Sequence, residues 1–401
     1  MGANDRRPTR RRVLETLGAS AGVVALAGCT GDGGDGGGDG GDGGGGGGDG
    51  GDGGGGGDGG GGGGGSAMAT VKVTGTGGSW GDGRKKAFYD PFRNGSDPWK
   101  NEHKLDFTAQ GLGQYLAKLT NKPDEPNHDL YEMRGPAARR LGEAGALAKQ
   151  KGNVDSWSEI PEYLRNDYHA STLIAPYGIA WNKGKIDKEF NSWEDLLDSD
   201  FEGKMGLPGW GDMWGDEFFY TVNAALGGDL DNLDPGFNYI QELVEKTDPV
   251  LISSIDEARK LFKQEEIWIS SFLSARTENI TLNTEGEVEM GWKIPQEGTW
   301  FDSWSWGVAK NRSEDTKQGA FEFLDGAYSP GPQAQFAQVF GYPPAHPDSY
   351  ELLPDDVIEN HPNIKLSDAQ LEALSQLDID WLQVRKQQSE DANRWRQIVR
   401  G

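Results

Sequence analysis

The segment ATVKVTGTGGSWGDG, residues 69–83, decides the fold class of this chain. Val71 and Val73 alternate with polar residues, which predicts a strand over 69–73. The glycines from Gly75 to Gly83 predict a turn, and residues 84–92 have the pattern of a helix. A strand followed by a turn and a helix is the building unit of an α/β fold.

The same alternation continues toward the C-terminus. Further strands are predicted at 105–107, 128–133, 178–181, 205–207, 267–270, 288–292 and 304–308. Further helices are predicted at 216–226, 255–264, 314–327, 331–339, 368–376 and 389–399, with Ser254 and Ser313 as N-caps. This order predicts α/β lobes, each built on a mostly parallel sheet flanked by helices.

Residues 31–65 cannot contribute to a packed core. The block holds 28 Gly and seven Asp, which bury no apolar surface, and Gly loses the most entropy on ordering. We therefore predict a disordered tether over 29–66, with an r.m.s. span of about 30–35 Å. The remaining residues, 67–401, are too many for one small core and suit two lobes.

Residues 1–28 have the pattern of an export signal. Arg10, Arg11 and Arg12 follow Thr9 in an arrangement that resembles the twin-arginine signal, which exports folded proteins. Cys29 ends the sequence LAGC, which resembles the lipobox whose cysteine is lipidated. The alternative is a lone cysteine in an ordinary signal peptide. Beyond residue 30 no apolar run reaches 18 residues, so no membrane-spanning helix is predicted there.

The composition excludes several classes of protein. A net charge of −25 disfavours a general nucleic-acid binder, which needs a basic face. Cys29 is the only cysteine, so a disulfide within the chain and a cysteine-based zinc site are excluded. The acidic composition and the signal together look like those of a secreted protein from a salt-loving archaeon. The alternative is an acidic protein that binds a cationic partner over its whole face.

Residues 77–81, GGSWG, match the G-x-S-x-G motif of α/β-hydrolases. In those enzymes several strands precede the serine, and a histidine follows it. Here one strand precedes Ser79, and the late histidines His346 and His361 lie in turn-like contexts next to proline. A Gly-rich loop that brings Trp80 to the rim of a cleft is the better interpretation. No metal-binding or P-loop motif occurs, so neither metal nor cofactor is predicted.

Aromatic residues crowd positions 292–306 around one carboxylate. The strand period of two would place Trp300, Asp302, Trp304 and Trp306 on one face. One interpretation is core packing, with Asp302 as a cap. The other is a box for an organic cation, in which each ring face contributes about 0.5–2 kcal/mol and Asp302 adds a charge-assisted hydrogen bond.

From Thr74 to Pro344 the chain resembles the solute-binding proteins of ABC importers, and within them the spermidine/putrescine-binding branch. Four segments carry the resemblance: GGSWGD with YDPF (77–82, 89–92); YGIAWN with SWEDL and FEGK (177–182, 192–196, 201–204); PQEGTWFDS (295–303); and FGYPP (340–344). The resemblance implies a type II periplasmic-binding-protein fold. It places lobe 1 at about 67–176 and 302–349, and lobe 2 at about 177–301 and 350–401.

The resemblance also implies where a ligand binds. The implied ligand-binding residues are Trp80, Asp212, Glu217, Trp268, Trp300 and Asp302. Trp300 and Asp302 correspond to the ring and carboxylate that hold the amine in polyamine binders. Two departures stand out: Trp214 replaces an acid expected three residues before Glu217, and Gly135-Pro136 stands where a stacking Tyr is expected.

The function implied is capture of a small organic cation, in particular a polyamine, and no enzymatic activity. The protein would be a monomer anchored outside the cell through its lipid, with an ABC permease and its cytoplasmic ATPase as partners. The alternatives are another solute of the same family (a thiamine-like compound, another organic cation or ferric iron) and, from another class, the Ser79 hydrolase.

Three triplets, at Asn94, Asn279 and Asn311, fit the N-x-[ST] pattern of N-glycosylation, which export would expose to the modifying enzyme. Three such triplets also occur by chance at this length.

We expect Cys29 to carry the lipid that anchors the protein. Because the tether that follows has no apolar surface, a Cys29→Ser variant should leave the membrane fraction. Fractionation of cells that carry the parent or the variant measures this. A variant that stays wholly in the membrane fraction would contradict the expectation.

Overall fold

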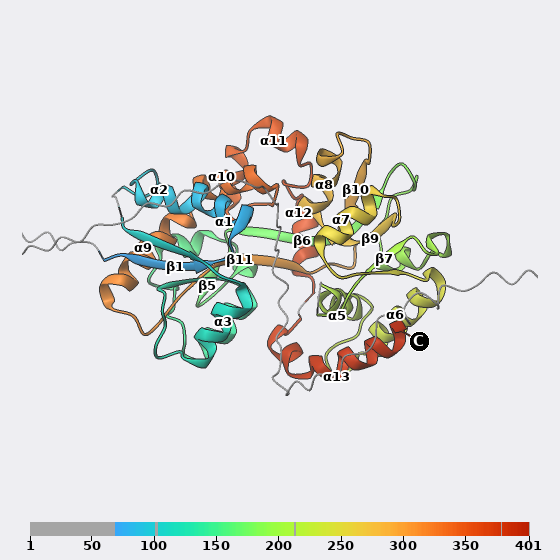
Figure 1. Cartoon of the computed structure of the whole chain (residues 1–401), viewed down its shortest axis with the longest axis horizontal. Coiled ribbons are helices and arrows are strands. Elements are labelled where there is room, and N and C mark those ends of the chain that lie inside the picture. The colour runs from blue at the N-terminus through green and yellow to red at the C-terminus, as the bar shows by residue number, and fades with distance from the viewer. Residues whose placement is uncertain (1–68, 101–102, 212–213, 378, 401) are drawn as a thin grey trace, which may run out of the picture. The chain divides into compact units, whose positions relative to one another are not determined.

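A mixed β-sheet is the frame of the computed structural model, which describes residues 69–100, 103–211, 214–377 and 379–400. The predicted signal, Cys29 and the tether lie outside these residues. The strand order is β2 (Leu105–Ala109), β1 (Val71–Gly75), β3 (Leu130–Arg134), β11 (Phe301–Val308), β6 (Leu173–Asn182), β9 (Ile269–Leu273), β7 (Met205–Pro208) and β8 (Val250–Ile252) (Figure 1). In addition, β10 (Met290–Lys293) pairs with β6.

Strand β6 links two halves of this sheet. Its residues up to Pro176 pair with β11, and its residues from Tyr177 onward pair with β9. The first half, β2, β1, β3 and β11, contains the parallel pairs β1–β2 and β1–β3. The second half, β9, β7, β8 and β10, contains the parallel pairs β7–β8 and β7–β9. The predicted parallel pairing is therefore present in both halves, and the strands around β6 add antiparallel pairs.

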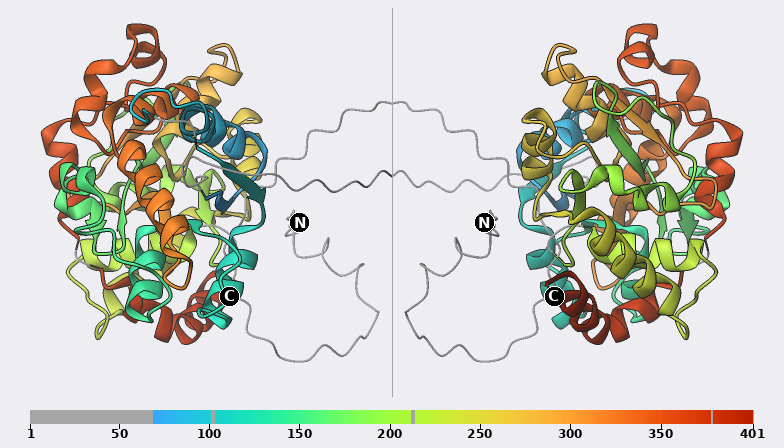
Figure 2. Two further views of the ribbon diagram at one scale, coloured as in Figure 1. Left: turned by 90° about the vertical axis from the view of Figure 1, so that its left-hand side faces the viewer. Right: turned by 90° about the vertical axis from the view of Figure 1, so that its right-hand side faces the viewer.

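Helices lie on both faces of the sheet, as the side views show (Figure 2). The longer ones are α3 (Leu112–Asn121), α4 (Gly135–Glu143), α5 (Gly215–Ala225), α6 (Asp234–Thr247), α7 (Ile255–Lys263), α8 (Ser274–Asn283), α9 (Glu314–Ala327), α10 (Pro330–Phe340), α12 (Asp368–Ser375) and α13 (Trp381–Arg400). Short helices are α1 (Gly78–Arg84), α2 (Asp90–Arg93) and α11 (Asp355–Asn360), and a hairpin joins β4 (Arg165–Asn166) to β5 (His169–Ala170). Among the described helices, none is both long and apolar enough to cross a bilayer.

The prediction of a turn over Gly75–Gly83 is wrong, because α1 begins at Gly78. A Cβ on Gly81 would lie 2.7 Å from the carbonyl oxygen of Thr76, and one on Gly83 would collide with the ring of Phe340. Glycine therefore lets α1 lie directly against α10. Close packing outweighs the low helix propensity of glycine here.

Helices α4 and α6 lack a sequence prediction, although each carries a helix start signal. Pro136 and Pro235 stand in the first turn of α4 and α6. Proline is favoured there, since its missing N–H would have no intrahelical partner. The sequence analysis took Gly135-Pro136 only as the replacement of an expected stacking Tyr, and the aspartates at 229, 231 and 234 favoured a solvated acidic turn.

The contact of α1 with α10 predicts opposite outcomes for two helical glycines. Gly83→Ala should lower the free energy of unfolding by about 1–3 kcal/mol, because its methyl group meets Phe340. The matched control is Gly331→Ala in α10, where nothing lies within 4 Å of the added carbon. It should be neutral or stabilise by up to about 1 kcal/mol. Guanidinium unfolding measures both, and a Gly83→Ala variant as stable as the parent would disprove the close packing.

Candidate ligand-binding site

One arginine joins carboxylates from both halves of the sheet. Arg134 ends β3, and its partner in the ladder is Trp304 of β11. The Nε atom of Arg134 lies 3.0 Å from Oδ1 of Asp302, which is also on β11. Its Nη1 atom lies 3.6 Å from Oε1 of Glu217, which stands in the first turn of α5. Since α5 follows β7, the Arg134–Glu217 pair connects the first half to the second.

These three charges are largely removed from water. The side chains of Asp302 and Glu217 are 6% and 8% exposed, and that of Arg134 is 22% exposed. Two buried carboxylates without a cation would be costly, because desolvation penalises each charge. Arg134 offsets that penalty for both and leaves the group with one net negative charge.

Aromatic rings enclose this group. Trp300 stacks on Tyr177 with ring centroids 4.7 Å apart, and Trp214 lies 5.4 Å from Tyr177. The guanidinium of Arg134 lies 5.2 Å from the ring centroid of Trp304 and 5.9 Å from that of Trp300. We call Arg134, Tyr177, Glu217, Trp300 and Asp302 the Arg134 cluster.

The hydroxyl of Tyr177 completes the cluster as a hydrogen-bond donor. It donates to Oδ2 of Asp302 over 3.5 Å. Burial, with Asp302 as a further cause, raises the pKa of Tyr177 well above its ordinary value. The phenol therefore keeps its proton at neutral pH, and it can share Asp302 with Arg134 or with a ligand.

Trp80 is held beside the cluster by a buried ion pair. Its indole N–H donates to Oε1 of Glu132 over 2.7 Å, and its ring meets that of Trp304 edge-on at 5.7 Å. Glu132 also accepts from Nε of Arg84 at 3.0 Å and from the backbone N–H of Thr76 at 2.9 Å. Arg84 is fully buried; burial lowers its pKa, and the charge of Glu132 opposes that shift.

The structure brings together only some of the residues implied by the sequence. Glu217, Trp300 and Asp302 meet in the Arg134 cluster, with Trp80 adjacent through Trp304. Trp268 lies elsewhere: its indole donates to the carbonyl of Glu265, and Lys204 stands over its ring. It precedes β9 at the end opposite Leu273, the residue that pairs with Tyr177. Asp212 is outside the described residues.

Arg134, Tyr177 and Trp381 were missed by the sequence analysis. Arg134 had a usable signal, because ligand sites in α/β folds gather at the carboxyl ends of strands and Arg134 ends β3. Tyr177 stood in a quoted segment, but nothing there marked its side chain. Trp381 of α13 lies 5.3 Å from the ring of Trp300, a contact between residues 81 positions apart that no local pattern reveals.

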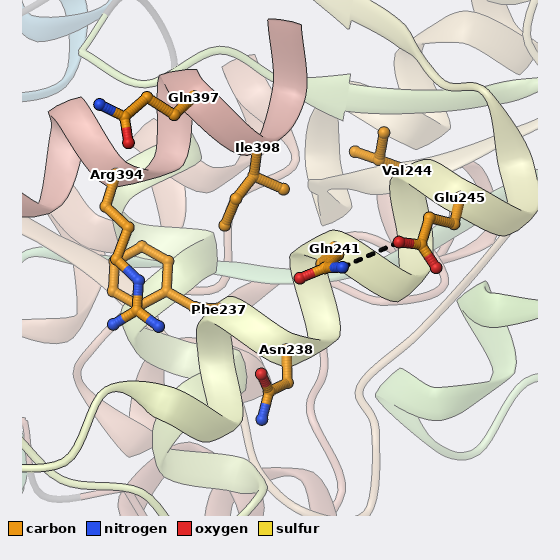
Figure 3. Close-up of a pocket in the computed structure, with 8 residues that line it drawn as sticks. All are labelled: Phe237, Asn238, Gln241, Val244, Glu245, Arg394, Gln397 and Ile398. Atoms are coloured by element: carbon orange, nitrogen blue, oxygen red, sulfur yellow. Dashed lines mark hydrogen bonds between the residues drawn. The ribbon is translucent and has the colours of Figure 1, made fainter. Parts of the chain in front are cut away.

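A separate groove of about 450 Å³ lies between α6 and α13 (Figure 3). Its lining residues are Phe237, Asn238, Gln241, Val244, Glu245, Arg394, Gln397 and Ile398. Several of its polar groups are already paired, since Arg394 contacts Asp234 and the ring of Phe237, and Gln241 donates to Glu245. The groove shares no residue with the Arg134 cluster.

The contacts of Ser79 and the histidines do not form a catalytic triad. Ser79 is exposed, and within the described part of the chain no hydrogen bond joins it to a histidine. Instead, His103, His346 and His361 face Glu322, Glu159 and Glu278. Likewise, no group of three potential metal-ligating side chains is found among the residues with described positions.

Comparison with known proteins identifies a family. Residues 98–365 match the family model described as bacterial extracellular solute-binding protein. No curated protein matches the chain.

Solved structures show the fold. An ABC transporter protein from Clostridium perfringens has a TM-score of 0.66 at 19% identity, over 82% of this chain and 99% of that one. The Atu4243 GABA receptor has a TM-score of 0.62 at 19% identity, over 82% and 98%. PotD, the spermidine/putrescine-binding protein of Streptococcus pneumoniae, has a TM-score of 0.60 at 13% identity, over 82% and 99%. The predicted type II periplasmic-binding-protein fold is confirmed.

The buried pair under Trp80 predicts unequal costs for two replacements. Glu132→Ala leaves the charge of Arg84 buried and should cost about 3–5 kcal/mol of unfolding free energy. The double replacement of Arg84 by Met and Glu132 by Leu removes both charges and should cost less than the single change. Guanidinium unfolding of the parent and both variants measures this, and a double variant that loses as much as Glu132→Ala would refute it.

Proposed function

Because the chain belongs to the family of bacterial extracellular solute-binding proteins, we propose that it captures a small solute with a cationic nitrogen group for an ABC permease. The observation that carries this proposal is the Arg134 cluster, in which Asp302 and Glu217 are buried around a guanidinium. A cationic nitrogen of a ligand can replace Arg134 in one of its two contacts with these carboxylates. Contacts with carboxylates and ring faces offset the free-energy cost of removing that nitrogen from water.

We place the ligand between two lobes that meet at β6. The partner change of β6 after Pro176 supports the predicted division at residues 176 and 177. The ion pair between Arg134 and Glu217 then crosses from one lobe to the other. Within the predicted second lobe we reassign 350–364 to the first, because Tyr350, Leu353 and Ile364 pack with Ala334 and Ala337 of α10. Closure of the lobes around the ligand would be a hinge motion.

A polyamine is the first candidate ligand. Trp300 and Asp302 support it, since a ring face and a carboxylate side by side suit an ammonium group. PotD, which is similar in fold, is a spermidine/putrescine-binding protein. A diamine bound here would have to move Arg134 away from Asp302 or Glu217.

A zwitterion is the second candidate, and Arg134 itself favours it. If Arg134 stays in the cleft, its guanidinium can bind the carboxylate of a ligand whose ammonium group faces Asp302. Arg276 of α8 donates from Nε to the hydroxyl of Tyr342 at 3.1 Å, and the ring centroid of Tyr342 lies 6.2 Å from that of Trp80. The Atu4243 GABA receptor is similar to this chain in fold.

The remaining parts of the proposal come from the sequence. The twin-arginine-like signal and Cys29 support an exported, lipid-anchored monomer that works with a permease and its ATPase. The net charge of −25 favours a protein that stays soluble in high salt. Thiamine-like compounds, other organic cations and ferric iron stay open as solutes of the same family.

Putrescine and 4-aminobutyrate separate the two candidates, because they share a four-carbon chain and differ in one end group. Asp302→Asn should weaken the binding of whichever ligand the parent binds by about ten- to hundredfold, a loss of roughly 1.5–3 kcal/mol. If Arg134 binds a carboxylate, Arg134→Gln should weaken 4-aminobutyrate at least about tenfold. For a polyamine site the same change should leave putrescine unchanged or bound more tightly. Calorimetry in low and molar salt measures these affinities.

Two tryptophans provide the matched control. Trp300→Ala should weaken binding, and Trp268→Ala should not, since only Trp300 lies in the Arg134 cluster. Spermidine and other amino acids extend the ligand panel. If the parent binds none of these solutes, the cationic-nitrogen proposal fails, while the family and the fold stand.

A further inference from the structure

The three N-x-[ST] triplets have different surroundings in the structure. Asn94 follows α2 as its C-terminal cap, and both Asn94 and Ser96 are exposed. Their backbone N–H groups are bonded within the turn, to Asp90 and Pro91. Among the contacts of the described residues, the side chains of Asn94 and Ser96 make no hydrogen bond. The side-chain amide of Asn94, which would accept the sugar, and the hydroxyl of Ser96 are thus both exposed to solvent.

The triplet at Asn279 is enclosed within a helix. Asn279 lies in the interior of α8 and is half-buried, between the buried residues Glu278 and Ile280. The hydroxyl of Thr281 accepts from the backbone N–H of Met290 at 3.0 Å. A modifying enzyme could reach this triplet only after α8 unwinds and the bond to β10 breaks.

The triplet at Asn311 is exposed but its side chains are engaged. The amide of Asn311 donates to the carbonyl of Pro123 at 3.1 Å and to Oδ1 of Asp124 at 3.0 Å. The intervening Arg312 pairs with Asp129 and donates to the carbonyl of Pro126. The amide nitrogen that a sugar would need is therefore held against the loop before β3.

We propose that Asn94, and neither of the other two asparagines, is N-glycosylated in the exported protein. The inference rests on the export proposed above: a protein exported after folding offers only the triplets that are accessible in its folded state.

The co-reactant is a sugar activated on a lipid-linked phosphate. A bond forms between Nδ2 of Asn94 and the anomeric carbon, the bond from that carbon to the phosphate oxygen breaks, and the amide loses one proton as the lipid phosphate leaves.

A sugar at this position would not obstruct the ligand. In Figure 1, helix α2 lies above β1 toward the left end of the molecule, whereas β6 and α5 lie to its right. The residues of the Arg134 cluster come from β3, β6, α5 and β11 and the segment before it, and none comes from α2. We therefore expect the same ligand affinity with and without the sugar.

Mass spectrometry of the full-length protein from its natural host tests the proposal. Peptide mapping should place a glycan on the Asn94 peptide and leave the Asn279 and Asn311 peptides unmodified. Ser96→Ala should remove the glycan, and Ser96→Thr, which preserves the motif, should retain it. Asn311→Gln is the control and should leave the glycan in place. Because Ser96 is exposed, these changes should not disturb folding, which thermal unfolding checks.

The outcomes separate this inference from the proposal on which it rests. An exported protein with no glycan at Asn94, or with glycans on Asn279 or Asn311 as well, overturns the inference and leaves export standing. Protein that stays in the cytoplasm without a glycan refutes both. A glycan that persists in Ser96→Ala would show that it is attached by other chemistry, and this too overturns the inference.

Discussion

Both halves of the sheet depend on the hydrogen bonds of β6. This strand is buried along its whole length, pairs with β11 as far as Pro176, and pairs with β9 and β10 beyond it. Asp302 and Tyr177 are placed on either side of that change of partner. The residues of the Arg134 cluster therefore lie where the two halves of the sheet share one strand, and any movement between the halves would have to be absorbed there.

Salt screens the buried charges of the Arg134 cluster less than it screens the charges of the surface. In molar salt the Debye length is about 3 Å, so exposed carboxylates interact weakly with anything beyond direct contact. The Arg134–Asp302 contact of 3.0 Å is short and largely shielded from solvent, so salt weakens it far less. An acidic composition and a buried cluster of paired charges can therefore coexist in one chain.

Local patterns predicted most strands and the capped helices, because alternation and N-caps are properties of a few adjacent residues. Ser254 accepts a hydrogen bond from the backbone N–H of Glu257, as expected for an N-cap. Helix α9 begins directly after Ser313 and spans the predicted residues 314–327. Contacts made across the fold escaped prediction. Gly83 packs closely on Phe340, 257 positions later, and Arg134 pairs with Glu217, 83 positions later. The sequence analysis named Glu217, Asp302 and Trp300. It missed Arg134, the cation between the two carboxylates, and Tyr177.

Helix α13 connects the C-terminal residues to the Arg134 cluster. The family match ends at residue 365, yet Trp381 contacts Trp300, and Gln388 of the same helix donates to Asp216 beside Glu217. One side of the Arg134 cluster is thus supplied by residues that follow the segment matched by the family model. Removal of the residues after 365 would therefore uncover one face of Trp300, although it would leave the whole matched segment in place.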